Sequence, residues 1–400
     1  MPASPSASAP GPASATGGAR APTLAFLVTE DWFFCSHFLP MARAAREMGL
    51  EVAVITRVRD HRATIEATGA RVIPLEAERR SLNPVAVAAN VARLAAILRE
   101  VRPDILHMIA LRSILVGGVA ARLAGVSRRV YALTGLGFLG ARRDALGRGA
   151  ASLIRALVRG PLENAATCYL LENPDDAADL GLTADDPRVV IVGGAGVDPD
   201  VFTPAPQPEE PTLRVAVVAR MLWSKGVDLA VEAVLRARAR GADVTLSLYG
   251  APDPSNPRAI PEATLRAWGE TPGISWRGRT SDIPGVWRDH HVALLPSRGG
   301  EGLPRTLLEA AACGRAIVTT DVPGCRLFVR DGVDGFVVPP DDAAALAERL
   351  QRLAADRALT LACGANARER LLSGFTERHV MDRVKAMYAA LLARNGGDRR

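Results

Sequence analysis

Short apolar runs alternate with helix-like patterns along almost the whole chain. Each run is bounded by turn residues and is too short for a helix, so each is predicted to be a buried β-strand. Seven runs precede residue 194: TLAFLVT, EVAVIT, RVIPL, DILHMI, RVYALT, TCYLL and RVVIVG. Six follow residue 212: LRVAVVA, DVTLSLYG, ISWRG, HVALLPS, AIVTT and GFVVP. Buried strands separated by helices predict an α/β fold with two doubly wound, Rossmann-like domains, each built on a parallel sheet.

A proline-rich segment separates the two sets of strands. TPAPQPEEPT, residues 203–212, has four prolines in ten residues and is the clearest linker in the chain. We therefore predict one domain over residues 23–202 and a second over residues 213–375, with a ligand cleft between them. Residues 1–22 and 394–400 are predicted to be disordered tails, and the first lacks the apolar core of a signal peptide.

The overall composition narrows the class of protein. A chain of 400 residues with 48% hydrophobic content is large enough to form two domains, each with its own hydrophobic core. The net charge of +6 is consistent with binding to an anionic lipid or a nucleotide, or it reflects composition alone. The aromatic content of 4% is too low for the stacking surface of a protein that binds single-stranded nucleic acid. The five cysteines are scattered without a CxxC pair, which favours a reducing cytoplasm over a disulfide framework or zinc site. The chain has no run of 18 apolar residues, so no membrane-spanning helix is predicted.

Two acids lie eight positions apart in EGLPRTLLE, residues 301–309. The flanking runs HVALLPS and AIVTT are predicted strands, so the segment between them should form a helix that starts at Pro304 and is closed by Gly314. Glu301 and Glu309 then lie near the carboxyl edge of a parallel sheet, where ligands bind in such folds. The positive end of the helix would explain one acid. Two acids at this edge predict a ligand site.

Two cations occupy the loop between the strand LRVAVVA and the next helix. They are Arg220 and Lys225, in VARMLWSKGVD. Of the 49 cationic residues only Lys225 and Lys385 are lysine, so a lysine in this loop is not explained by composition. An ammonium acts as a point charge on a phosphate oxygen, and a guanidinium binds two oxygens at once. We interpret the pair as a phosphate site, with two solvated loop cations as the alternative.

Three further patterns have simpler explanations. GLGFLG, residues 135–140, matches GxGxxG but lacks the strand and acid expected about twenty residues later in a dinucleotide site. DPD, residues 198–200, imitates a metal-binding motif within a sequence typical of a turn, and we interpret it as a turn. His107 lies in the strand DILHMI, where a packed core residue and a site residue are equally consistent with the pattern.

Residues 141–160 predict a basic amphipathic helix. Between residues 128 and 161 there are seven arginines and one acid, Asp144. The apolar positions recur at helical spacing (Leu146, Ala150, Leu153, Ile154, Leu157), opposite Arg148, Arg155 and Arg159. Either the apolar stripe packs on the domain and the arginines face water, or the arginines attract an anionic membrane surface, at about 1 kcal/mol per cation.

These motifs together resemble the family 4 glycosyltransferases of the two-domain GT-B type. Glu301 and Glu309 match the family's E-x7-E pair, and VARMLWSKGVD resembles its R-x4-K-G phosphate loop. YGAPDPSNPRAIPEATLRAW and EGLPRTLLEAAACGRAIVTTDVPGCR resemble the bacterial galactosaminyltransferases that extend polyprenyl-diphosphate-linked glycans. The chain departs from the family at TEDWFFCSHFLP, where many members carry paired glycines. The resemblance implies that a C-terminal helix, residues 376–393, crosses back to the first domain.

The resemblance also implies a role for each site residue. Glu309 would hold the ribose of the nucleotide, Glu301 the donor sugar, and Arg220 with Lys225 the diphosphate that leaves. Further donor contacts are implied for Gly278, Arg279, Gly302, Leu303 and Pro304. His107 would lie near the transferred sugar. The acceptor side of the cleft would include Asp31, His37 and Gly135.

The implied reaction is transfer of a hexose or N-acetylhexosamine, with retention of configuration, from a nucleotide sugar to a lipid-linked glycan. The expected donor is a UDP-sugar and the expected acceptor is polyprenyl-diphosphate-linked, with no metal, no other cofactor and no nucleic-acid partner. The expected location is the cytoplasm, at the anionic inner face of the membrane. The alternatives are a two-domain UDP-sugar epimerase, which would need no acceptor, a nicotinamide enzyme that uses GLGFLG, and a non-catalytic sugar-nucleotide-binding protein. A mere binder should have lost a phosphate cation, and this chain has both.

Overall fold

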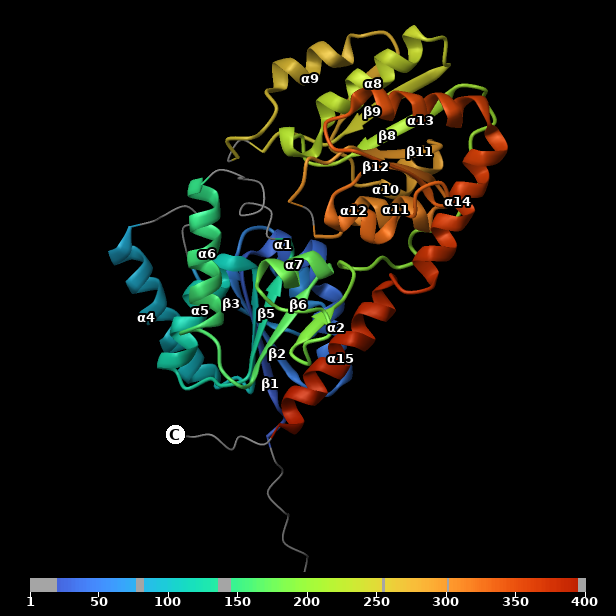
Figure 1. Cartoon of the computed structure of the whole chain (residues 1–400). Coiled ribbons are helices and arrows are strands. Elements are labelled where there is room, and N and C mark those ends of the chain that lie inside the picture. The colour runs from blue at the N-terminus through green and yellow to red at the C-terminus, as the bar shows by residue number, and fades with distance from the viewer. Residues whose placement is uncertain (1–19, 77–82, 136–144, 254–255, 301, 395–400) are drawn as a thin grey trace, which may run out of the picture.

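The computed structural model describes residues 20–76, 83–135, 145–253, 256–300 and 302–394. Two parallel sheets form separate domains, one above the other in Figure 1, and helices cover both faces of each sheet. The predicted fold class is therefore confirmed. In the described residues, no helix combines the length and apolar content needed to cross a bilayer.

In the described part of the first domain there are seven strands, and each overlaps a run predicted from the sequence. Its strands are β1 (Thr23–Glu30), β2 (Glu51–Arg57), β3 (Arg71–Pro74), β4 (Ile105–Ile109), β5 (Arg129–Leu133), β6 (Thr167–Leu171) and β7 (Val189–Ile191). Its helices are α1 (Asp31–His37), α2 (Leu39–Glu47), α3 (Arg62–Glu66), α4 (Pro84–Val101), α5 (Ala110–Leu123), α6 (Ala145–Arg159) and α7 (Pro174–Asp179).

The second domain contains the other six strands, again at the predicted runs. They are β8 (Leu213–Val218), β9 (Val244–Tyr249), β10 (Ile274–Gly278), β11 (Val292–Leu295), β12 (Ala316–Thr320) and β13 (Gly335–Val338). Its helices are α8 (Val227–Ala239), α9 (Glu262–Gly269), α10 (Ile283–Arg288), α11 (Arg305–Ala312), α12 (Pro323–Phe328), α13 (Ala343–Ala355) and α14 (Arg357–Leu372), with a 3-10 turn, η1, at Trp223–Lys225. The last helix of the chain is α15 (Glu377–Ala393).

In both sheets the order of the strands reverses next to the first strand of the domain. The strand order is β3-β2-β1-β4-β5-β6-β7 in the first domain and β10-β9-β8-β11-β12-β13 in the second. Every pair of neighbouring strands is parallel. Such a reversal opens a crevice at the carboxyl ends of the strands, where open α/β sheets bind ligands.

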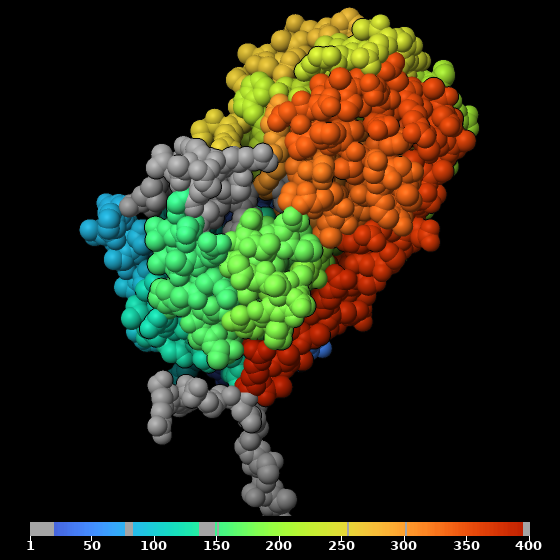
Figure 2. Space-filling view, in the orientation of Figure 1, coloured from blue at the N-terminus to red at the C-terminus, as the bar shows by residue number. Residues whose placement is uncertain are grey.

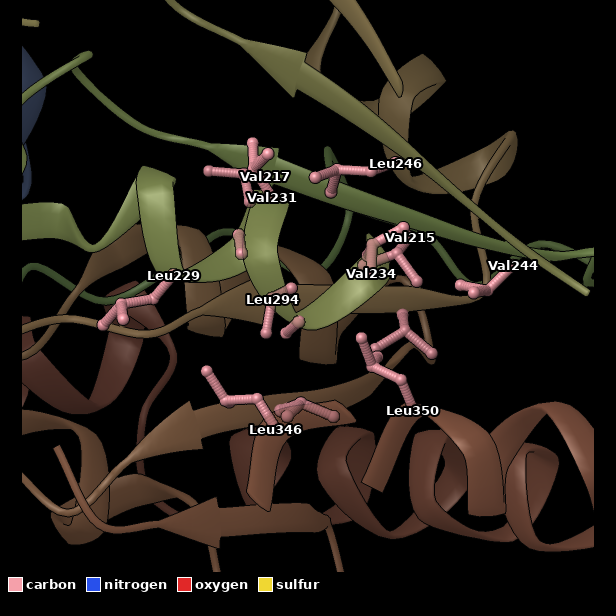
Figure 3. Packing of buried hydrophobic residues seen from close by; sticks show 14 of the residues in the cluster. Val215, Val217, Leu229, Val231, Val234, Val244, Leu246, Leu294, Leu346 and Leu350 are labelled. Atoms are coloured by element: carbon pink, nitrogen blue, oxygen red, sulfur yellow. The ribbon is translucent and has the colours of Figure 1, made fainter. Parts of the chain in front are cut away.

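Each sheet separates two hydrophobic cores. In the second domain, β8 and β9 pack against α8 and α13 through Val215, Val217, Val234, Leu246 and Leu346, as Figure 3 shows. A second cluster on the opposite face buries α11, α12 and α14. Burial on both faces explains why most of the strands are continuous apolar runs, whereas β9 alternates between buried and half-buried residues.

The C-terminal helix α15 belongs to the core of the first domain. It leaves α14, runs down the outside of the molecule and packs against α2, as its red ribbon and surface in Figures 1 and 2 show. Its apolar face joins β1, β2 and β4 in one cluster, to which it contributes Val380, Val384, Met387, Tyr388 and Leu391. The chain thus passes between the domains twice.

Two local predictions were wrong. Helix α11 begins at Arg305, so Pro304 is the N-cap and not the first helical residue; its ψ of 118° is extended. On α6, Leu153 and Leu157 were expected to pack inward but are 62% and 37% exposed, whereas Val158 is fully buried. The core of the first domain meets α6 at Val158, which is outside the predicted stripe, and at Ile154, which is the stripe residue on the neighbouring side of the helix.

Of the arginines on α6, Arg159 also differs from the predicted water-facing stripe. Arg159 pairs with Glu163 at 3.1 Å, and its guanidinium lies 5.7 Å from the centre of the Tyr169 ring. Arg155 is exposed. The side chains of Leu146, Arg148 and Ala150 are not among those that the structure describes.

Candidate active site

A cavity of about 990 Å³ lies between the two domains. The first domain lines it with Glu30 at the end of β1, Arg57 at the end of β2, and residues of α1. The second domain lines it with the loops that follow β8, β9 and β10, and with one face of α11. The cavity therefore occupies the crevices of both sheets, where the domain boundary and the strand order predict a ligand.

Glu309 reaches this cavity from α11 and is only 9% exposed. One carboxylate oxygen, Oε1, accepts a hydrogen bond from Nε of Arg305 at 2.9 Å. Burial raises the pKa of Glu309, and the neighbouring Arg305 offsets part of that increase. A buried, oriented carboxylate of this kind can accept hydrogen bonds from a diol such as the ribose of a nucleotide.

The predicted phosphate cations lie in the loop after β8. Arg220 is exposed and lines the cavity, and Lys225 ends η1. Gly226 follows with φ of 68°, and a Cβ there would lie 1.9 Å from the carbonyl oxygen of Pro296. Only glycine allows the backbone at residue 226 to come this close to Pro296, which explains why a glycine follows the lysine. The close contact also fixes the position of the Lys225 backbone.

His37 brings the first domain close to these cations. It ends α1, and its Nδ1 lies 2.6 Å from the hydroxyl of Ser36. Burial lowers the pKa of His37 and the charges of Arg305, Lys225 and Arg220 add to this effect, which brings the pKa to about 4. The imidazole is therefore neutral at pH 7 and lies within electrostatic reach of the predicted phosphate site.

The loop that begins α11 is bound to the first domain. Glu301 lies outside the described residues, but Leu303 donates its backbone N–H to Oε2 of Glu172 at 2.6 Å. A Cβ at Gly302 would lie 1.8 Å from the same oxygen, so a larger residue there would displace the Glu172 carboxylate. The Leu303 N–H was predicted to bind the donor, and in this structure Glu172 occupies it.

Of the two residues predicted at the end of β10, Arg279 lines the cavity. Gly278 has φ of 68° and its carbonyl accepts a hydrogen bond of 2.7 Å from the N–H of Gly250. That bond joins the loops after β9 and β10 at the edge of the cavity. Gly278 thus shapes the wall, while Arg279 supplies the charge.

Asp31 has a structural role and does not line the cavity. Its side chain is fully buried and accepts backbone hydrogen bonds from Trp32 at 2.7 Å, Arg59 at 2.7 Å and His61 at 3.1 Å. Burial alone would raise the pKa of Asp31, but these three bonds lower it overall. This corrects its predicted place on the acceptor side of the cleft.

His107 is a packed core residue. It is fully buried in β4, and its Nδ1 lies 2.7 Å from the hydroxyl of Tyr388 on α15. The ring also contacts Phe26 and Phe38, and burial lowers its pKa to about 3. The structure therefore corrects the prediction that His107 faces the transferred sugar: Phe26 of β1, Phe38 between α1 and α2, and Tyr388 of α15 enclose it.

Gly135 follows β5 with φ of 90° and is half-buried. The rest of GLGFLG, residues 136–140, lies outside the described residues, so the nicotinamide alternative has no structural test here. The DPD sequence forms the predicted turn, in which the N–H of Asp200 donates to Oδ1 of Asp198 at 2.9 Å. Across the described ranges, no cluster of three or more His, Cys, Asp or Glu side chains is arranged to hold a metal ion.

Sequence reasoning missed two site residues, Arg305 and Glu172. Arg305 contacts Glu309 and also donates to the backbone carbonyl of Ser36 at 2.6 Å. The spacing of Arg305 and Glu309, four residues apart on a helix, was a usable signal for their ion pair. Glu172 follows β6 directly, and an acid at the carboxyl end of a buried strand was a second signal.

Comparisons with known proteins agree with this geometry. Residues 212–356 match the family model described as glycosyl transferases group 1, and residues 23–169 match the model described as glycosyl transferase 4-like. A relative from Campylobacter jejuni, N,N'-diacetylbacillosaminyl-diphospho-undecaprenol alpha-1,3-N-acetylgalactosaminyltransferase, is 27% identical over 88% of this chain and 94% of its own length. The Escherichia coli UDP-Gal:alpha-D-GlcNAc-diphosphoundecaprenol alpha-1,3-galactosyltransferase is 23% identical over 77% of this chain and 81% of its own length.

Solved structures share the fold. Anabaena HepE in complex with UDP-glucose superposes with a TM-score of 0.74 at 17% identity, over 92% of this chain and 99% of that one. Sucrose-phosphate synthase from Thermosynechococcus elongatus gives a TM-score of 0.76 at 21% identity, over 93% and 99% of the two chains. At these identities the likeness concerns the two-domain architecture.

Proposed function

The chain belongs to the family 4 glycosyltransferases of the GT-B fold, and we propose that it extends a polyprenyl-diphosphate-linked glycan in polysaccharide or glycoconjugate assembly. The donor in this proposal is a UDP-sugar that carries a hexose or N-acetylhexosamine, and transfer retains the anomeric configuration. The two relatives above support the acceptor class, because both of their names include a diphospho-undecaprenol glycan.

The observation that carries the proposal is the buried Glu309 carboxylate in a cavity that also holds Arg220 and Arg279. A nucleoside diphosphate needs an acceptor for the ribose hydroxyls and cations for the phosphates, and this cavity provides both. A volume of about 990 Å³ is enough for a nucleotide sugar with part of an acceptor.

In the proposed reaction the acceptor hydroxyl attacks C1 of the donor sugar from the face that the diphosphate leaves. The C1–O bond to phosphate breaks as the new glycosidic bond forms, and the hydroxyl proton passes to a phosphate oxygen. Arg220 and Lys225 stabilise the negative charge that develops on the leaving diphosphate, the kind of interaction that usually contributes most to catalysis. In this scheme the two side chains do the work of a divalent metal. Glu301 contacts the sugar, whose ring carries developing positive charge.

A donor panel tests the proposal. The full chain is incubated with UDP- and GDP-sugars and an undecaprenyl-diphosphate-linked monosaccharide, and the lipid product is analysed by mass spectrometry and NMR. We expect one sugar to be added from a UDP-sugar with the α or β configuration of the donor unchanged. Conversion of the UDP-sugar without acceptor would indicate an epimerase, and binding without any product would indicate a sugar-nucleotide-binding protein.

The proposed acceptor is a lipid, so the protein needs to reach a membrane surface, and α4 to α6 supply a suitable face. Residues 84–161 contain twelve arginines and three acids, a net charge of +9 within a chain of +6. The same helices expose apolar side chains to solvent: Val85, Val119, Leu123, Leu153 and Leu157. Exposed leucines beside arginines fit the interface of an anionic bilayer, since apolar burial and charge attraction then act together.

Vesicle co-sedimentation tests this surface. Leu153→Asp with Leu157→Asp should release the protein from phosphatidylglycerol vesicles, and added salt should weaken binding of the wild type. Leu235→Asp with Leu361→Asp is the matched control, because those leucines are 39% and 48% exposed on helices of the second domain. Equal binding by the two double variants would refute the membrane face and leave the transfer reaction untouched.

A further inference from the structure

Arg305 connects the two domains at the nucleotide carboxylate. It is the first residue of α11, and its Nε lies 2.9 Å from Oε1 of Glu309. Its Nη1 donates to the carbonyl oxygen of Ser36 on α1 at 2.6 Å. One half-buried guanidinium therefore holds a side chain of the second domain and the backbone of the first at the same time.

The contact with Glu309 affects how that carboxylate can bind a ligand. Arg305 uses Oε1, so Oε2 is the oxygen left for a hydroxyl. Burial raises the pKa of Glu309, and Arg305 is the side chain that offsets this, which favours the anion. The other charged groups around the cavity are Glu30 and Arg57 from the first domain and Arg220, Asp253 and Arg279 from the second.

The contact with Ser36 affects the first domain. Ser36 lines the cavity, and its hydroxyl lies 2.6 Å from Nδ1 of His37. Among the three positive charges that lower the pKa of His37, Arg305 has the largest effect, ahead of Lys225 and Arg220. The end of α1, the predicted phosphate cations and the carboxylate thus meet around one guanidinium.

A similar ion pair elsewhere shows what Arg305 would do if it only stabilised α11. Arg330 contacts Asp334, four residues later, at 2.7 Å, and Asp334 is fully buried. Asp334 does not line the cavity between the domains. Arg305 and Arg330 share the local pairing, and Arg305 in addition donates a hydrogen bond to the backbone of the opposite domain.

We propose that Arg305 is a positioning residue that couples nucleotide binding to the alignment of the two domains. It holds Glu309 toward the ribose and, through the carbonyl of Ser36, holds α1 against the diphosphate site. Nucleotide affinity then depends on the charge of the side chain. Turnover depends on its two-point geometry, because the acceptor domain must stay aligned while the sugar is transferred. The inference rests on the proposed function, since the ribose and the acceptor enter through it.

Two substitutions separate the two roles. Arg305→Met removes both contacts. Arg305→Lys keeps a positive charge beside Glu309, but a single ammonium cannot reproduce the guanidinium fork that spans Glu309 and Ser36. Arg330→Met is the matched control, because it removes an arginine from a buried i,i+4 acid in the same domain.

The measurements are the Kd of UDP by calorimetry and kcat for sugar transfer by the full chain. We expect Arg305→Met to weaken UDP binding by about tenfold or more, the size of one hydrogen bond to a charged group, and to lower kcat as well. Arg305→Lys should stay within about threefold of the wild-type Kd and still lose about tenfold in kcat. Arg330→Met should change neither.

Each other outcome has a definite meaning. If the wild type binds UDP and transfers sugar while Arg305→Met matches it in both, the inference is wrong and the proposed function stands. Equal losses of affinity and turnover in the Met and Lys variants would also overturn the coupling, since charge and geometry would not separate. A wild type that binds no UDP contradicts the proposed donor itself. If Arg305→Met does not fold, the Lys variant still decides between these results.

Discussion

Glu309→Gln should weaken UDP binding without disturbing the rest of the cavity. The substitution keeps the shape of the side chain, and the amide oxygen can still accept from Nε of Arg305, as Oε1 does now at 2.9 Å. The oxygen that faces the ligand then becomes an NH₂ group, which donates and cannot accept from a ribose hydroxyl. A hydrogen bond to a charged group contributes about 1.5–3 kcal/mol. One lost bond therefore corresponds to a decrease of about tenfold to a hundredfold in UDP affinity.

Calorimetry with two ligands makes the test specific. UDP contains the ribose, whereas pyrophosphate contains only the diphosphate, so Glu309→Gln should lose affinity for UDP and keep its affinity for pyrophosphate. Glu377→Gln is the matched control: Glu377 is paired with Arg43, burial also raises its pKa, and it does not line the cavity. Because a ribose contact is present in the ground and transition states alike, the loss should appear in KM for the donor and not in kcat. Wild-type affinity for UDP in Glu309→Gln would refute the ribose assignment.

Four other variants test the remaining assignments. Arg220→Ala and Lys225→Ala should each lower kcat by orders of magnitude with a cooperative melt, because cations at the leaving diphosphate act mainly in the transition state; near-normal kcat in either would contradict the phosphate assignment. Glu301→Ala should leave the Kd of UDP nearly unchanged and lower turnover, since UDP lacks the sugar; a large loss of UDP affinity would reverse its role with that of Glu309. Burial holds the pKa of His107 at about 3, below its ordinary value of 6.5, so the folded state resists protonation and stability should fall as the pH drops below 6.5, by up to about 1.4 kcal/mol per pH unit. Urea unfolding at pH 7.5, 6 and 5 measures this slope, which His107→Gln should flatten; an unchanged slope would show that other groups cause it.

The sequence predicts the strands of this fold well, because most of the parallel strands are buried on both faces and therefore read as continuous apolar runs. All thirteen observed strands overlap predicted runs. The pattern of α6 is less informative. Helical periodicity identifies an apolar stripe, but only the neighbouring elements decide which side of it is covered. Val158 meets the core, and Leu153 and Leu157 remain exposed.

The candidate site is predictable only where its contacts are local. Arg220 and Arg279 follow strands and Glu309 lies in the helix after β11, all at the carboxyl edge of the second sheet, and the structure brings these three to the cavity. His107 could not be assigned from its strand, because the helix that encloses it starts 270 residues later with Glu377. Arg305 and Ser36 are 269 residues apart, and no periodicity in the chain relates them.

The position of α15 has a consequence for the order in which the protein can fold during synthesis. The strands of the first domain leave the ribosome first, but one face of their sheet is covered by Val380, Val384, Met387 and Leu391, near the other end of the chain. At about 5–20 residues per second, the roughly 200 residues between β7 and Leu391 take about 10 to 40 s to make. During that time the second domain, with all its own strands and helices present, can fold completely. The domain that is synthesised first is thus the last to be finished, and its uncovered apolar face is what a chaperone would encounter on the nascent chain.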